Sequence, residues 1–188
     1  MDQVKYKSPS KLIAKIEIDH QEKAKTDLIM DPPSKALLNR ISQLYESERN
    51  GILKIREKVL SFDKRMTEIT DKSGVFLYGK GKNKPCIEIN LAKTIMGRKT
   101  RTINNIKVPE PKLLLWLPYE FINPYVNNNC VRMLIDTDWL ETATITGYTP
   151  QTNTGFSVKE KPYFSAKKYN NSLDELIDIA LETWLKRL

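Results

Sequence analysis

The chain has 188 residues and a formal net charge of +8, with 40% hydrophobic and 29% charged residues. This composition supplies enough apolar side chains for a folded core and argues against wholesale disorder. No apolar run reaches the roughly 18–20 residues that a membrane span needs, and the N-terminus lacks the apolar core of a secretory signal. Two cysteines and a single histidine argue against a disulfide framework or a zinc site, so we expect a soluble cytoplasmic protein.

The positive charge is concentrated between Lys72 and Lys112. This stretch holds ten basic and two acidic residues, a net charge of +8, and the basic and acidic residues of the rest of the chain balance. A concentrated positive field attracts polyanions, of which nucleic acid is the commonest. A basic surface that faces an acidic protein, or that serves solubility alone, is the alternative.

The N-terminal residues predict a flexible tail followed by a strand. Residues 1–10 carry scattered charges around Ser8-Pro9-Ser10, as in a tail. Residues 11–19 alternate apolar and polar side chains, which is typical of a strand with one buried face. Prolines at positions 32 and 33 then favour the start of a helix nearby.

Residues 34–70 carry a seven-residue apolar repeat. Its positions are Leu38, Ile41, Tyr45, Glu48, Ile52, Ile55, Val59, Phe62, Met66 and Ile69. Such a repeat indicates a coiled-coil-like seam on one protruding helix of about 36 residues. Asn50-Gly51 is a natural helix stop, so a helical hairpin that turns there is the other interpretation. One long helix would leave part of the seam exposed and therefore predicts homo-oligomerisation or a partner protein, whereas a hairpin would satisfy the seam within the chain.

The following residues, 75–166, predict a β-rich basic module. Strands are expected at 75–78, 86–91, 112–117, 130–135 and 141–148. The first two form a hairpin with the tip Gly79-Lys80-Gly81-Lys82-Asn83-Lys84-Pro85. Residues 92–97 predict a short helix or turn before the basic loop 98–101.

The chain closes with a clear amphipathic helix. Ser172 and Glu175 have the spacing of a capping box, and an apolar stripe follows. The stripe consists of Leu173, Leu176, Ile177, Ala180, Leu181, Trp184, Leu185 and Leu188. We therefore predict an α+β protein with one domain over 11–188, and we expect Trp184 to be buried in its core.

The candidate binding residues lie on the hairpin tip and on the basic loop. They are Lys80, Lys82, Lys84, Arg98, Lys99 and Arg101. Glycine lets a backbone approach a phosphate closely, and lysine and arginine neutralise its charge. The tip does not have the spacing of an ATP-binding loop, and no motif predicts a cofactor. These residues predict a non-catalytic accessory protein that binds DNA or RNA through its phosphate backbone.

A metal-dependent nuclease is a further alternative. Asp136 and Asp138 follow an apolar strand, and carboxylates at a strand end can hold Mg²⁺, with Glu88 as a possible third ligand. The same D-x-D pattern is ordinary turn chemistry, because aspartate hydrogen-bonds the backbone that follows it.

Overall fold

The computed structural model describes residues 30–92, 100–122, 130–149 and 172–188. The predicted tail at 1–10, the strand at 11–19, the turn at 93–97 and the loop residues Arg98 and Lys99 lie outside these ranges. The described elements belong to one compact unit, Pro32–Leu188.

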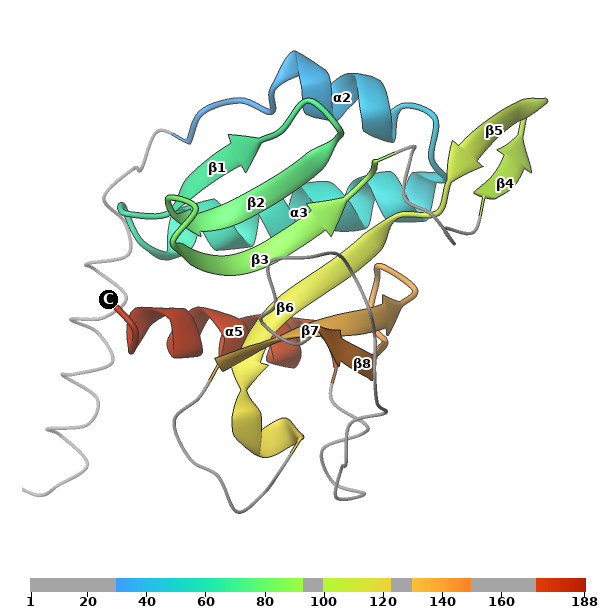
Figure 1. Ribbon diagram of the computed structural model, residues 1–188. Helices are drawn as coiled ribbons and strands as arrows, with labels where there is room; N and C mark the ends of the chain where they lie inside the picture. Colours follow the sequence, from blue (N-terminus) through green and yellow to red (C-terminus); the bar gives the residue numbers. More distant parts are fainter. Residues whose placement is uncertain (1–29, 93–99, 123–129, 150–171) are drawn as a thin grey trace, which may run out of the picture. The chain divides into compact units, whose positions relative to one another are not determined.

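A six-stranded antiparallel sheet forms the centre of this unit (Figure 1). Its strands are β1 (Thr67–Thr70), β2 (Val75–Lys80), β3 (Lys84–Asn90), β6 (Lys112–Pro118), β7 (Cys130–Thr137) and β8 (Ala143–Thr149), in the order β1-β2-β3-β6-β7-β8. Strands β4 (Thr100–Ile103) and β5 (Ile106–Pro109) form a separate two-stranded hairpin. A mainly antiparallel sheet with helices confirms the α+β class and the expected strands at 75–78, 86–91, 112–117, 130–135 and 141–148.

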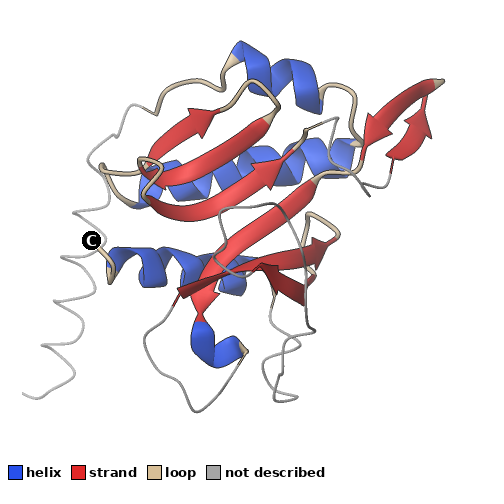
Figure 2. Ribbon diagram, in the orientation of Figure 1, coloured by secondary structure: helices blue, strands red, loops and turns tan. Residues whose placement is uncertain are grey.

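Within the described ranges, three α-helices and one short 3-10 turn accompany the strands. They are α2 (Lys35–Ile41), α3 (Glu46–Phe62), α5 (Leu173–Leu185) and the 3-10 turn η1 (Tyr119–Phe121). In Figure 2, the blue helices α3 and α5 lie behind the red strands, so both helices cover the same face of the sheet. In the described part of the chain, no helix has the length and apolar character that a membrane crossing requires.

The prediction of one long helix over 34–70 was wrong, and so was the alternative hairpin at Gly51. Helix α2 stops at Ile41, and a new helix begins after Tyr45, whose backbone N–H donates to the Glu48 carboxylate at 3.1 Å. A carboxylate at the third helical position that binds the residue before the helix favours a helix start there. Helix α3 ends at Phe62, and the last heptad position, Ile69, belongs to β1.

Gly51 lies inside α3 because another part of the chain packs directly against it. A Cβ atom at this position would lie 2.0 Å from the carbonyl oxygen of Trp139 and 2.8 Å from its Cβ. Trp139 itself has a left-handed backbone with a φ of 66°. The glycine therefore allows a close contact between a helix and a loop. In the sequence, such a glycine looks the same as one that ends a helix.

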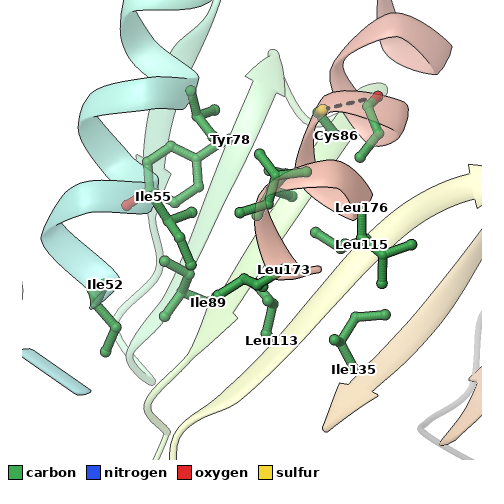
Figure 3. Packing of buried hydrophobic residues seen from close by; sticks show 14 of the residues in the cluster. Ile52, Ile55, Tyr78, Cys86, Ile89, Leu113, Leu115, Ile135, Leu173 and Leu176 are labelled. Atoms are coloured by element: carbon green, nitrogen blue, oxygen red, sulfur yellow. Dashed lines mark hydrogen bonds between the residues drawn. The ribbon is translucent and has the colours of Figure 1, made fainter. Parts of the chain in front are cut away.

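The core fills the space between the sheet and the two helices (Figure 3). Alternate strand residues face the helices, and the cross-strand pairs Tyr78–Ile87, Ile87–Leu115 and Leu115–Met133 continue this buried face across four strands. From α3, Ile52 and Ile55 pack into the same cluster. Six of the ten seam positions are thus buried within the chain itself, and among the remaining positions Leu38, Tyr45 and Phe62 are exposed.

Helix α5 completes the core as predicted. The Ser172 side chain accepts the Glu175 backbone N–H at 3.2 Å and begins the helix. Trp184 is fully buried, and the Cys86 thiol donates to the Ala180 carbonyl at 3.4 Å. Burial of this thiol raises the pKa of Cys86 to about 12, which fits its role as a small core side chain.

The sheet has two ends that differ in what lies there. The hairpin end contains the start of β1 and the β2–β3 tip, together with Pro118 and Cys130. The cleft end contains the β1–β2 turn, Asn90, Lys112 and the β7–β8 turn. Helices α3 and α5 both begin at the cleft end and finish at the hairpin end.

Candidate nucleic-acid interface

The β2–β3 hairpin presents an exposed basic tip. Lys80, Gly81, Lys82 and Asn83 are all exposed. Gly81 has a φ of 65°, and a Cβ added there would meet nothing within 4 Å. Gly79 sits at a shift in the strand register, where a Cβ would lie 2.3 Å from the Lys84 carbonyl oxygen. The two glycines thus allow the tight turn that carries both lysines into solvent.

Lys84 belongs to the base of the hairpin. Its ammonium donates to the backbone carbonyls of Arg187 and, at 3.4 Å, of Leu188. In return, the Trp184 indole N–H donates to the Lys84 carbonyl at 2.9 Å, and the Arg187 guanidinium donates to the Pro85 carbonyl. These bonds fasten the end of α5 to the first residues of β3, and they occupy Lys84.

The turn from α3 into β1 lies beside the same hairpin. The Thr67 hydroxyl donates to the Gly79 carbonyl at 2.8 Å. Within the turn, the Arg65 guanidinium holds the Asp63 carboxylate through two bonds, at 2.9 and 2.7 Å. These bonds with Arg65 lower the pKa of Asp63 to about 2. Lys64, between them in sequence, is exposed.

The predicted site residues do not all come together. Lys80, Lys82 and Lys84 lie at the hairpin end, whereas Arg101 lies on β4 at the cleft end. The intervening β3 has seven residues, or roughly 23 Å at 3.3 Å per residue. Arg101 forms an ion pair with the buried Glu48, and its guanidinium lies 4.2 Å from the centre of the Tyr45 ring. Its positive charge is therefore largely compensated within the chain.

A cleft of about 580 Å³ lies beside this pair. Glu110, Asp136 and Asp138 line it with Lys112, so acidic groups outnumber basic ones once Arg101 and Glu48 are paired.

The Asp138 carboxylate has a structural role in the β7–β8 turn. Its Oδ1 accepts the backbone N–H groups of Leu140, Glu141 and Thr142, each at 2.9 Å. Glu88, the third residue considered for a metal, forms an ion pair with Arg132 on the sheet instead. In the residues that the structure describes, no three metal-binding side chains come together. The geometry therefore favours the interpretation of the D-x-D pattern as a turn in which aspartate hydrogen-bonds the backbone.

Further basic residues at the hairpin end had no signal in the sequence. Lys64 and Lys186 both lie outside the 72–112 stretch, and the fold brings their segments beside the hairpin. Each is followed by an arginine that is itself engaged, Arg65 with Asp63 and Arg187 with Pro85.

Comparison with known proteins adds no relative: no family model matches the chain, and no curated protein or solved structure gives a significant match.

Proposed function

We propose that the protein is a non-catalytic nucleic-acid-binding accessory protein that contacts the phosphate backbone through its β2–β3 hairpin. The observation that carries this proposal is the exposed glycine-containing tip, on which Lys80 and Lys82 form no ion pair with any described residue. The basic loop at 98–101 was expected to share the contact, and its contribution stays a prediction.

The chemistry of the tip suits phosphate oxygens. An exposed ammonium group loses little hydration when it meets a phosphate, and each such contact releases condensed counterions from the nucleic acid. The affinity then depends steeply on salt and little on base sequence. Glycine at position 81 leaves no side chain between the turn backbone and the phosphate.

The direct test is the salt dependence of binding. We expect the wild-type protein to bind a 20-base-pair DNA duplex, and Lys80→Ala with Lys82→Ala to lower the slope of log affinity against log salt by about two, because each phosphate contact contributes about 0.9. The matched control is Lys72→Ala with Lys107→Ala, which removes the same charge from exposed lysines on the β1–β2 turn and on β5. Fluorescence anisotropy over about 50–200 mM salt measures both slopes.

The competing interpretation is a basic surface that holds an acidic protein. Single- and double-stranded DNA and RNA are compared with polyglutamate of similar charge. Tighter binding to polyglutamate than to every nucleic acid, or no binding to any nucleic acid at low salt, would refute the proposal. An equal loss in the hairpin variant and the control would instead show that only net charge matters, and would remove the tip from the interface.

A further inference from the structure

We infer that the nucleic-acid contact surface is built from three segments distant in sequence, with Lys64 and Lys186 acting beside Lys80 and Lys82. This inference rests on the proposed function and extends it to residues outside the 72–112 stretch. It also assigns the partner chemistry: a sugar-phosphate backbone, read without regard to base sequence.

The first additional segment is the turn between α3 and β1. The Met66 N–H donates to the Asp63 carbonyl at 2.9 Å, so Lys64 occupies the middle of a tight turn. Thr67, the first residue of β1, pairs with Gly79, one residue before Lys80. The turn is therefore next to the hairpin tip, and the ion pair between Asp63 and Arg65 leaves Lys64 as its uncompensated charge.

The second additional segment is the end of α5. Lys186 is the C-cap residue of α5, and it is exposed. The next residue, Arg187, hydrogen-bonds to Lys84 and Pro85 at the base of the hairpin. The four bonds between this segment and Lys84 or Pro85 fix its distance from the tip. Lys84 and Arg187 thus hold the two segments together, while Lys186 faces solvent.

The cations at the hairpin end divide into an engaged and a free group. Arg65, Lys84 and Arg187 bond to protein oxygens. Lys64, Lys80, Lys82 and Lys186 are exposed and form no ion pair with any residue in the described ranges. Each segment contains at least one free lysine and one engaged residue: Lys64 with Arg65, Lys80 and Lys82 with Lys84, and Lys186 with Arg187. Such an arrangement presents separate ammonium groups on a fixed base.

The dimensions of this surface match a nucleic-acid strand. Neighbouring strands lie about 4.8 Å apart and a helix layer lies about 10 Å from its sheet, so the three segments span on the order of 10–15 Å. Phosphates follow one another at about 3.4 Å per strand along a duplex axis. Four free ammonium groups over this width can meet three or four successive phosphates, which predicts a slope of about 3–4 from this surface.

The test compares two double variants with the same control. Lys64→Ala with Lys186→Ala should lower the salt slope on the 20-base-pair duplex by about two, as much as Lys80→Ala with Lys82→Ala. The quadruple variant should lower it by about 3–4, and Lys72→Ala with Lys107→Ala should leave it nearly unchanged. All four substituted lysines of the interface are exposed, so circular dichroism and thermal unfolding should show an unaltered fold.

Two results separate this inference from the proposed function. A hairpin variant that lowers the slope while Lys64→Ala with Lys186→Ala does not would overturn the three-segment surface and leave the hairpin site intact. No binding by the wild-type protein would overturn both. A second duplex of unrelated sequence should give the same slope and affinity within about threefold, and a larger preference would overturn the assignment to backbone contacts.

Discussion

Asp138 shows how a single carboxylate sets a turn at the cleft end. Partial burial alone would raise the pKa of Asp138, but the three backbone N–H donors outweigh it and lower this pKa to about 2. The unfolded chain has an aspartate pKa near 3.9. The stabilisation by this group is therefore complete above about pH 4 and is lost as the pH falls through about 2.

The corresponding prediction concerns Asp138→Ala. We expect it to lower the free energy of unfolding by about 1 kcal/mol at pH 7, the usual value for a lost cap. The difference from wild type should shrink between pH 4 and pH 2. Urea unfolding at several pH values measures it, and Asp138→Asn, which keeps the acceptor oxygen, is the control. A difference that stays constant down to pH 2 would contradict the role of the charge.

Trp184 is the largest fully buried side chain, and its indole N–H is bonded to the Lys84 carbonyl. We expect Trp184→Ala to cost about 3–5 kcal/mol, because a large aromatic truncation in a core leaves a cavity. Leu185→Ala, one residue later and 43% exposed, should cost less than about 1 kcal/mol. Chemical denaturation compares the two, and equal losses would show that α5 does not pack through Trp184.

At the scale of elements, Gly51 joins α3 to the β7–β8 turn. Alanine is about 1 kcal/mol more favourable than glycine within a helix. Here the added Cβ would overlap the Trp139 backbone, so we expect Gly51→Ala to destabilise the fold by about 1–3 kcal/mol. Asn50→Ala, exposed on the same helix, should be neutral or slightly stabilising. If Gly51→Ala were more stable than wild type, the β7–β8 turn would have to move to make room for the new Cβ atom.

The elements that could be predicted from sequence are those with strong local signals. The β2–β3 hairpin has its glycines, and α5 has its serine cap and apolar stripe. The break before α3 was missed because Tyr45 lies on the heptad and Glu48 looked like a core exception, whereas its carboxylate begins the helix. Ile69 continued the same period into β1, where its pairing with Leu77 places it on a strand. Tertiary pairing decided these positions, and periodicity alone could not.

Self-association through residues 34–70 stays a prediction with a narrower basis. Ile52, Ile55 and Val59 are buried against the sheet, so they are not available to a second chain. Any partner would meet Leu38, Tyr45 or Phe62, which lie on different elements or turns of that segment.

At the scale of the whole unit, the antiparallel hairpins redistribute the charge. The 72–112 stretch runs along the sheet and back, which places Lys72 and Lys112 at the cleft end and the tip lysines at the hairpin end. The basic residues that are close together in sequence therefore lie at two opposite ends of the sheet. Lys64 and Lys186 lie at the hairpin end because β1 pairs with β2 and α5 packs against β3. The distribution of charge along the sequence does not reveal this placement.

The two helices reinforce this polarity. Acidic residues occupy the first turns of α3 and α5 at the cleft end, and Lys64 and Lys186 follow their last turns at the hairpin end. The acidic residues thus stabilise the helix N-termini that they face. The same arrangement would turn the hairpin end toward a polyanion during a diffusional encounter.

The bonds between α5 and the start of β3 also have a consequence for synthesis on the ribosome. Leu113 and Leu115 leave the ribosome about 70 residues before the helix that covers them is complete, which is roughly 3–14 s at 5–20 residues per second. Throughout that interval the nascent sheet exposes leucine and isoleucine side chains to solvent. Synthesis of α5 is therefore the event that closes the core. Through the bond between Trp184 and Lys84, it also fixes the base of the β2–β3 hairpin.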